Sequence, residues 1–330
     1  MKCMLIFIAI CLSAVIIVRH YQGEVQPYQF MSKAHTNIFR GLAAFIIVFQ
    51  HVGGGFGTRV FTPLGGTGVA MFLIASGYGL NESYKRRLLK KTSGGGYWKN
   101  KLLRVFLPYA LFEIAFIWYY DEFSVAAYLM DITCLKPHYW YLGILLIEYI
   151  AFWIVSLNAK TYQNRYWILG TVGILIFIFG GALYAEQAAS FLVGVMISDC
   201  YEKCKEISES KASTLGLALI GIVLLASKQF PFMRVYEGTH IWFLIQMIMK
   251  LSLALFLVFI SSSWQKVFNN RLLETAGIMS LEIYLVHIKA LDIFQLGLPN
   301  VIAIILFIVC SVVGTWLLHQ FIVRFSKRFA

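Results

Sequence analysis

The sequence predicts an all-α integral membrane protein, a bundle of about ten or eleven transmembrane helices. Hydrophobic residues make up 59% of the 330-residue chain, charged residues only 13%, and the mean hydropathy is +0.73. These values lie outside the range of ordinary soluble domains. The apolar runs lack the period-two alternation of barrel strands, and backbone groups in lipid must be satisfied within each segment, so helices are the expected structure.

Eleven apolar runs are candidates for these helices, several of them near the lower length limit for a span. In order they are residues 4–18, 37–51, 68–84, 102–120, 139–157, 166–183, 187–200, 214–227, 240–262, 278–294 and 299–323. The first run resembles a signal peptide in length but lacks a clear small-residue cleavage site, so residues 1–20 are expected to form an additional N-terminal helix. No linker or internal repeat separates the runs, which predicts one domain over residues 1–330.

The formal charge of +12 comes from Lys and Arg residues that lie mostly in short loops between apolar runs. This distribution signals topology and does not indicate a nucleic-acid partner. The strongest basic cluster runs from Lys85 to Arg104, and the positive-inside rule places it in the cytoplasm. Alternation from this loop puts the C-terminus inside as well, and it places Asp121 and Glu122 outside.

The six cysteines are scattered, and no CxxC pair or Cys/His ligand spacing occurs among them. The sequence therefore predicts neither a disulfide framework nor a metal site. Cys200 and Cys204 are one helical turn apart, but two thiols alone make a poor metal site, so a structural role is expected for both.

Arg40 and His51 bracket the apolar stretch of the second run, and their separation of eleven residues is roughly 16 Å along a helix. Arg40 is expected near the cytoplasmic face. His51 is expected near the outer end, followed by glycines 53–55, where a flexible backbone could approach a ligand closely. An imidazole can take a proton from a hydroxyl near neutral pH. The alternative is a histidine that simply meets water at the membrane interface.

Ionisable residues within the apolar runs are costly in lipid, so each marks a function or needs a partner. Glu113, Glu148, Lys250 and Glu282 are such residues. Pairing is expected for them. Glu148 either holds an imidazole in one tautomer or forms a salt bridge to Arg40 or Lys250.

A polar stripe is expected near the end of the chain, because Ser280, Tyr284 and His287 have the spacing of one helix face. The stripe either lines a substrate path or joins helices by hydrogen bonds. His138 lies at the outer end of its run and precedes Trp140 in a group of aromatic residues. Aromatic rings there suit anchoring at the interface, which is the simpler interpretation, and they also suit stacking against a sugar ring.

Five segments, in order along the chain, carry a resemblance to a known family. The stretch NIFRGLAAFIIVFQHVGG, residues 37–54, resembles the opening helix of the membrane acyltransferase-3 family, whose signature is an arginine, ten residues and a histidine. Arg40 and His51 fit that spacing. The stretch GTGVAMFLIASGYGL, residues 66–80, is similar to the second motif of the family, with Ser76 and Tyr78 in matching places.

Three further segments match the family in order. The basic stretch YWKNKLLRVFLPY resembles a motif of two arginines followed by a proline; Lys101 replaces the first arginine and Arg104 remains. A lysine keeps the positive charge but cannot form the bidentate hydrogen bonds of an arginine, so the replacement weakens the case for phosphate binding by this pair. PHYWYLGILLIEY, residues 137–149, resembles the His-x-Trp-aromatic-Leu segment of the family, and SLEIYLVH, residues 280–287, resembles its Ser, Tyr and His segment.

The resemblance implies an enzyme of the bacterial cytoplasmic membrane that moves an acetyl or other short acyl group from acyl-CoA to a hydroxyl of a cell-surface or lipid-linked glycan. It implies that His51 is the base or a transient acyl carrier and that Arg40 is catalytic. Acetyl-CoA is expected as a donor substrate, with no permanently bound cofactor and with membrane lipid as the surroundings. The residues expected to bind donor or acceptor are Lys101, Arg104, Ser76, Tyr78, His138, Trp140, Glu148, Ser280, Tyr284 and His287.

The charge pattern agrees with this geometry, because coenzyme A is an anionic cytoplasmic molecule and the basic loop with Arg40 offers positive charge on that face. The alternative for the loop is topogenesis alone. A transporter or flippase for lipid-linked sugars is the main rival function, since buried charges in many helices also describe a conduit. A glycan polymerase would be expected to have a larger outer loop, and a non-catalytic sensor would not need His51.

Overall fold

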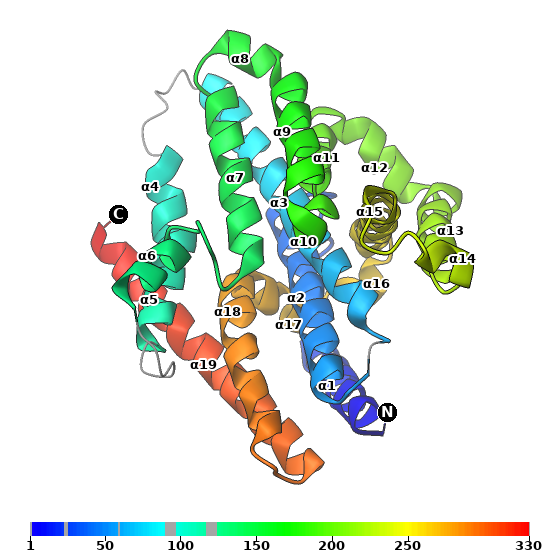
Figure 1. The fold of residues 1–330 in the computed structure, drawn as a ribbon, viewed down its shortest axis with the longest axis vertical. Helices are drawn as coiled ribbons and strands as arrows, with labels where there is room; N and C mark the ends of the chain where they lie inside the picture. Colours follow the sequence, from blue (N-terminus) through cyan, green and yellow to red (C-terminus); the bar gives the residue numbers. More distant parts are fainter. Residues whose placement is uncertain (1, 23–25, 59, 90–96, 117–123, 330) are drawn as a thin grey trace. The chain divides into compact units, whose positions relative to one another are not determined.

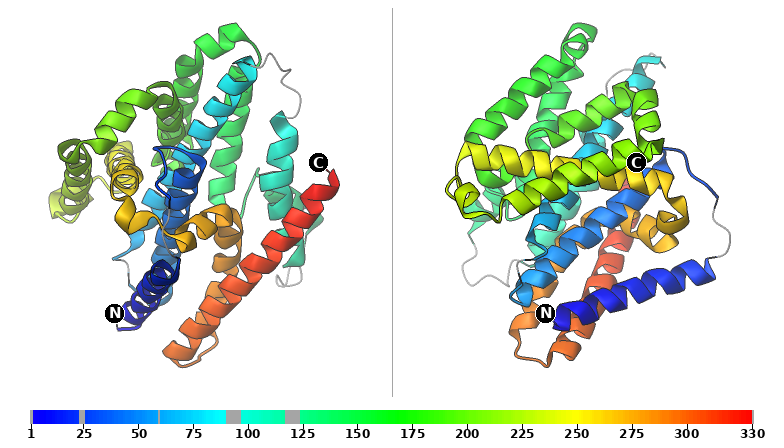
Figure 2. Two further views of the ribbon diagram at one scale, coloured as in Figure 1. Left: turned by 180° about the vertical axis from the view of Figure 1, so that it is seen from behind. Right: turned by 90° about the vertical axis from the view of Figure 1, so that its right-hand side faces the viewer.

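The computed structural model describes residues 2–22, 26–58, 60–89, 97–116 and 124–329 (Figures 1 and 2). It is 84% helical, and no strand occurs in the described residues. Six helical segments are long and apolar enough to cross a membrane, and α12 with α13 would add a seventh if this bent pair is one span. The chain is therefore a multi-pass α-helical membrane protein, as the sequence predicts. The number of crossings, ten or eleven, stays a prediction.

The chain divides into two compact units, each built from two separate stretches of sequence. The first unit comprises residues 1–85 and 166–280. Its helices are α1 (Lys2–Tyr21), α2 (Lys33–Gly55), most of α3 (Thr62–Leu89), α9 (Arg165–Phe179), α10 (Gly181–Ala185), α11 (Ser190–Asp199), α12 (Tyr201–Glu209), α13 (Lys211–Ser227), α14 (Pro231–Arg234), α15 (His240–Ser263), α16 (Gln265–Phe268) and α17 (Arg271–Ile278). The single-domain prediction stays a prediction.

The second unit comprises residues 86–165 and 281–330. Its helices are α4 (Tyr97–Lys101), the π-helical turn η1 (Leu102–Phe106), α5 (Leu107–Ala115), α6 (Val125–Ile132), α7 (Trp140–Val155), α8 (Ala159–Gln163), α18 (Ser280–Ala290), the 3-10 turn η3 (Leu291–Gln295) and α19 (Asn300–Phe329). Figures 1 and 2 show α18 and α19 running side by side. A hydrogen bond joins them, because His319 Nδ1 lies 2.8 Å from Glu282 Oε1.

Two predicted runs differ from the helices observed. The run 166–183 ends early, since α9 stops at Phe179 and Gly181 has a φ of 70°, a left-handed conformation that suits glycine. The span that follows is Gly181–Asp199. The run 278–294 is interrupted, because α18 covers only 11 residues, roughly 16 Å, which is too short to cross a bilayer alone.

Glycines bring helix backbones of the first unit into direct contact. A Cβ at Gly41 of α2 would overlap the carbonyl oxygen of Leu273, and a Cβ at Gly277 of α17 would overlap that of Asn37. Small residues allow this close approach, which is how helices pack in a membrane. The α2–α17 crossing places the residues just after α17 beside the N-terminal half of α2, near Arg40.

A second close crossing joins α3 to α11. A Cβ at Gly77 would overlap the carbonyl oxygen of Phe191, and a Cβ at Gly194 would overlap that of Ile74. Gly77 lies between Ser76 and Tyr78, so the glycine of the second sequence motif has a packing function.

Gly77→Ala is expected to lower the free energy of unfolding by about 1–3 kcal/mol, because the added methyl group would force α3 and α11 apart. Gly79→Ala, two residues further on, is the matched control, since a Cβ at Gly79 would meet no other atom within 4 Å. The control should be neutral or more stable by up to about 1 kcal/mol. Thermal unfolding of the detergent-purified variants measures both, and equal midpoints would contradict the close crossing.

The first helix packs against the rest of the first unit. Arg19 Nη1 donates a hydrogen bond to the carbonyl oxygen of Val267 at 3.1 Å, and Asn270 Nδ2 donates to that of Val15 at 2.9 Å. Phe7 packs edge-on against Phe49 of α2, with ring centroids 5.5 Å apart. The predicted additional N-terminal helix is thus formed, and it is docked to its neighbours.

Candidate functional site

Arg40 and His51 lie on the same unbroken helix, α2, which begins where the Ser32 hydroxyl caps the backbone N–H of His35. Both side chains are half-buried. The helix continues through Gly55, so the glycines after His51, where the sequence indicated a flexible backbone, belong to its last turn. With 1.5 Å of rise per residue, the two predicted catalytic residues are roughly 16 Å apart along one rigid axis.

The structure brings Arg40 to Ser280, another residue singled out in the sequence. Arg40 Nη2 donates a hydrogen bond to Ser280 Oγ at 2.8 Å. Ser280 is buried at the start of α18, and only Met279 separates it from the end of α17, which packs against α2. The glycine-mediated α2–α17 crossing therefore brings Ser280 close enough to Arg40 for the serine hydroxyl to accept a hydrogen bond from the guanidinium.

A buried ion pair lies within the first unit. Lys250 Nζ of α15 is paired with Glu186 Oε2, and each side chain is at most 10% exposed. The Lys250 side chain packs over Gly66, whose carbonyl oxygen accepts a hydrogen bond from Gln187 Nε2 at 2.8 Å. Lys250 was among the charged candidates, whereas Glu186 was missed because it falls in the gap between two predicted runs.

The start of α3 connects this ion pair to the end of α2 that carries His51. Gln50, the residue before His51, packs against Gly65, and Gly66 is the residue covered by Lys250. Paired charges of this kind inside a membrane protein mark function or hold helices in register. The end of α2 thus lies in a polar part of the first unit.

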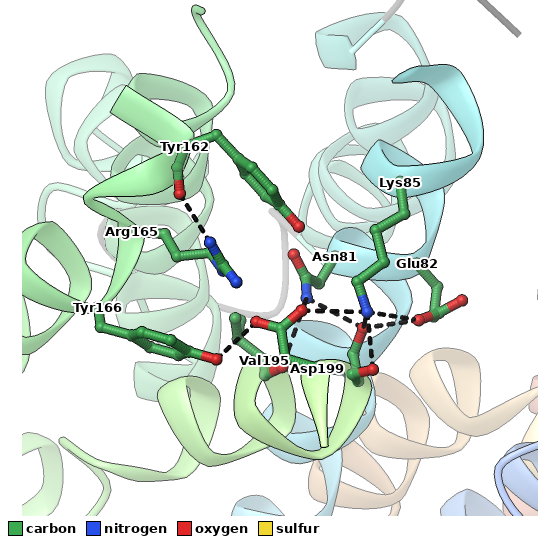
Figure 3. A network of polar contacts seen from close by, with 9 residues as sticks. Asn81, Glu82, Lys85, Tyr162, Arg165, Tyr166, Val195 and Asp199 are labelled. Atoms are coloured by element: carbon green, nitrogen blue, oxygen red, sulfur yellow. Dashed lines mark hydrogen bonds and ion pairs between the residues drawn. The ribbon is translucent and has the colours of Figure 1, made fainter. Parts of the chain in front are cut away.

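Figure 3 shows a polar network at the other end of α3. Asn81 Nδ2 donates to Ser198 Oγ at 3.0 Å and to Asp199 Oδ1 at 2.8 Å, and Ser198 Oγ donates to Glu82 Oε1 at 2.7 Å. Lys85 Nζ lies 3.0 Å from Asp199 Oδ1 and 3.2 Å from Glu82 Oε1. Lys85, which the sequence assigned to the basic loop, therefore lies on α3 and forms ion pairs with Glu82 and Asp199.

The remaining sequence candidates of the first unit, Ser76 and Tyr78, are half-buried on α3 on either side of the Gly77 contact. The network next to them was not foreseen. Its sequence signal is a set of polar residues on otherwise apolar helices, at Asn81, Ser198 and Asp199.

In the second unit, Lys101 and Arg104 lie on α4 and on the π-helical turn η1. The turn has a physical cause: Pro108 has no N–H to offer the carbonyl of Arg104, and the backbone N–H of Leu107 reaches back to Leu102. Arg104 is exposed. Residues 90–96, which include Lys90 and Lys91 of the basic loop, lie outside the described residues.

Lys101 does not extend freely into solvent. Its Nζ lies 3.5 Å from the centroid of the Tyr97 ring and donates to the Tyr97 carbonyl oxygen at 3.2 Å. Burial, and secondarily the charge of Arg87, lowers the pKa of Lys101 to about 8. The lysine is thus charged at neutral pH and loses its charge in the mildly alkaline range.

The last two sequence motifs meet within the second unit. The ring of Tyr284 on α18 lies 5.5 Å from that of Tyr139 and 5.4 Å from that of Tyr141, measured between centroids. The hydroxyl of Tyr139 donates to the carbonyl oxygen of Leu285 at 2.8 Å. His287, one turn beyond Tyr284, packs against its ring at 5.9 Å.

The hydrogen bond of His287 defines its tautomer. Its Nδ1 lies 2.8 Å from the carbonyl oxygen of Ile283, and a carbonyl can only accept, so Nδ1 carries the proton in the neutral ring. Nε2 then holds the lone pair. His287 is 1% exposed, so this basic nitrogen is enclosed in the protein.

The other candidates of the second unit belong to α7 and the segment before it. Glu148 is buried at 2% exposure and Trp140 is half-buried. His138 is exposed and approaches two carboxylates, with its Nδ1 at 3.8 Å from Asp131 Oδ2 and 4.0 Å from Glu113 Oε2. Neither contact of His138 was expected from the sequence, because Asp131 lies 7 residues away on α6 and Glu113 lies 25 residues away on α5.

These features define a polytopic α-helical membrane protein with polar side chains held inside its units. A family model described as an acyltransferase domain matches residues 36–320. The chain belongs to the acyltransferase-3 family and is a membrane acyltransferase, which confirms the resemblance seen in the sequence. The match covers every candidate residue from Arg40 to His287. Searches of curated proteins and of solved structures gave no match.

Proposed function

We propose that the protein moves an acetyl or other short acyl group from cytoplasmic acetyl-CoA to a hydroxyl of a cell-surface or lipid-linked glycan. The observation that carries the proposal is the placement of Arg40 and His51 on one helix, α2, inside the family match. A cation and an imidazole held roughly 16 Å apart on one helix suit a reaction whose anionic donor and neutral acceptor enter from opposite faces. The membrane is the bacterial cytoplasmic membrane, with the C-terminus on the cytoplasmic side.

His51 acts on the acceptor hydroxyl in one of two ways. As a general base, an imidazole nitrogen takes the hydroxyl proton while the oxygen attacks the thioester carbonyl carbon. The carbon–sulfur bond then breaks, and the coenzyme A sulfur leaves with that proton as a thiol. As a transient carrier, the imidazole nitrogen first attacks the thioester carbonyl carbon, the carbon–sulfur bond breaks, and coenzyme A leaves as a thiol with the imidazole proton. The acceptor oxygen then attacks the acyl-imidazole, the carbon–nitrogen bond breaks, and the hydroxyl proton returns to the imidazole. In both routes one ester bond replaces one thioester bond.

Arg40 serves the donor. The Ser280 hydroxyl accepts one of its hydrogen bonds, which fixes the guanidinium and leaves further N–H groups for an anionic group. Arg104 and Lys101 contribute positive charge to the donor, and Ser76, Tyr78 and Glu148 bind donor or acceptor. Aromatic residues stack well on sugar rings, so His138, Trp140, Tyr284 and His287 are assigned to the acceptor.

The experiment that tests the function measures the O-acetyl content of the surface glycan by proton NMR in wild-type cells, a deletion strain and a complemented strain. Acetyl groups that are lost on deletion and restored on complementation, together with transfer from labelled acetyl-CoA by the purified protein, are the expected result. An unchanged acetyl content with altered glycan amount or chain length would instead favour a transporter, flippase or polymerase.

Donor affinity is expected to fall as the pH rises through the pKa of Lys101, about 8, because the ammonium loses its charge. If this charge is needed, the KM for acetyl-CoA rises by up to about tenfold between pH 7 and pH 9. In Lys101→Arg the rise should disappear, since arginine keeps its charge. Lys99→Arg, at an exposed position two residues earlier, is the control and should retain the wild-type profile. Identical profiles in all three proteins would remove Lys101 from the donor site.

A further inference from the structure

Three side chains that can ligate a metal converge in the second unit. They are Glu113 on α5, Asp131 on α6 and His138 in the segment before α7. One ligand atom from each, a carboxylate oxygen or an imidazole nitrogen, lies within 4.8 Å of the other two. No spacing rule links these residues in sequence, and only the tertiary structure brings them together.

Asp131 is held in a fixed orientation. Its Oδ1 accepts hydrogen bonds from the Tyr109 hydroxyl and, at 2.6 Å, from the backbone N–H of His138. These donors leave Oδ2 facing the His138 ring, with Nδ1 at 3.8 Å. Outer partners that orient a carboxylate in this way are typical of metal ligands.

Glu113 supplies the second observation. Its side chain is 4% exposed, and Oε1 is buried with no hydrogen-bond partner among the described residues. Its Oε2 lies 4.0 Å from His138 Nδ1, so the carboxylate points into the cluster. A buried carboxylate oxygen without a partner is costly, and it lies beside the second carboxylate of Asp131. Lys289 on α18 is half-buried and supplies one positive charge near Glu113. A divalent cation between the two carboxylates would ligate both of them directly and offset both costs.

We propose that Glu113, Asp131 and His138 bind one Zn²⁺ ion. An imidazole nitrogen with two carboxylate oxygens suits zinc, whereas calcium and magnesium prefer oxygen ligands throughout. Zinc–ligand distances of about 2.0–2.2 Å require the three ligand atoms to draw together slightly. His138 is the side chain that moves, because its side chain is 54% exposed while both carboxylates are buried.

Three protein ligands leave the fourth position of a tetrahedral ion open to water or to a sugar hydroxyl. The exposed face of His138 gives the ion its path of entry. Zinc binding is measured directly and does not require acyl transfer. The result therefore tests this proposal independently of the proposed function.

The test uses the full-length protein, purified in detergent and stripped of metal with a chelator. The protein is then dialysed against Zn²⁺ alone, and mass spectrometry measures the bound metal per chain. One zinc per chain is expected in the wild type. Glu113→Gln, Asp131→Asn and His138→Gln should each weaken binding at least tenfold. Glu282→Gln is the matched control, because it alters another buried carboxylate that faces an imidazole, that of His319, and it should bind zinc like the wild type.

Co²⁺ in place of Zn²⁺ provides a second readout, because a tetrahedral Co²⁺ site with nitrogen and oxygen ligands absorbs visible light. This measurement uses the wild-type protein and does not require any variant to fold. Absence of bound zinc and of this absorption in the wild type would overturn the proposal and leave a carboxyl pair that shares a proton. Zinc that binds equally well to all three cluster variants would overturn it as an adventitious ion only. Displacement of zinc by equimolar Ca²⁺ would overturn the assignment of the metal.

Discussion

His51→Ala is expected to lower the rate of acyl transfer by about 10²- to 10⁴-fold, the range that positioned general acid–base groups supply. The protein should remain in the membrane in normal amount, because His51 is half-buried near the end of α2 and the substitution leaves Arg40, Ser280 and the α2–α17 crossing intact. Labelled acetyl-CoA with the purified enzyme measures the rate. Binding of the donor should change much less than the rate.

His20→Ala is the control for this experiment, since His20 is exposed on α1 and lies outside the family match. It should retain wild-type transfer. Wild-type transfer in His51→Ala would exclude both the base and the carrier route for this residue. It would direct attention to His287, whose Nε2 holds the lone pair of a second enclosed imidazole.

Removal of one partner of the Glu186–Lys250 ion pair is expected to lower the free energy of unfolding by about 3–5 kcal/mol, the usual cost of an uncompensated buried charge. Both side chains are at most 10% exposed, so water cannot replace the missing partner. Glu186→Gln leaves the ammonium unpaired, and Lys250→Met leaves the carboxylate unpaired. Chemical denaturation in mixed micelles, followed by circular dichroism, gives the free energies.

The double variant Glu186→Gln/Lys250→Met is the control, because it removes both charges together. It should recover most of the stability lost in either single variant, since a neutral pair carries no uncompensated charge. Additive losses would show that the two charges do not interact. A double variant that is stable but inactive would assign the pair to the reaction as well as to the fold.

Some features were predictable because they depend on local sequence. The apolar runs and their basic flanks specify a helical membrane protein, since composition and hydropathy decide which solvent a segment enters. The distance between Arg40 and His51 along the helix axis was also predictable, because both residues lie on one helix with a fixed rise per residue. Helix breaks were harder to predict: Gly181 ends one run early, and α18 is separated from α17 by a single residue.

The partners of the polar side chains were decided only by the tertiary structure. Arg40 meets Ser280 across 240 residues of sequence, because glycines allow α2 and α17 to touch backbone to backbone. Lys250 forms an ion pair with Glu186, which lies in a gap between two apolar runs where the sequence pattern predicted no partner.

The sequence by itself therefore determined the class of protein, its family and the helix that carries the expected catalytic residues. The tertiary structure decided which charge faces which, including the approach of Glu113, Asp131 and His138. The physical reason is that hydropathy and helix periodicity act within one segment, whereas pairing depends on how closely two helices can approach, and a few small residues far apart in the chain set that distance.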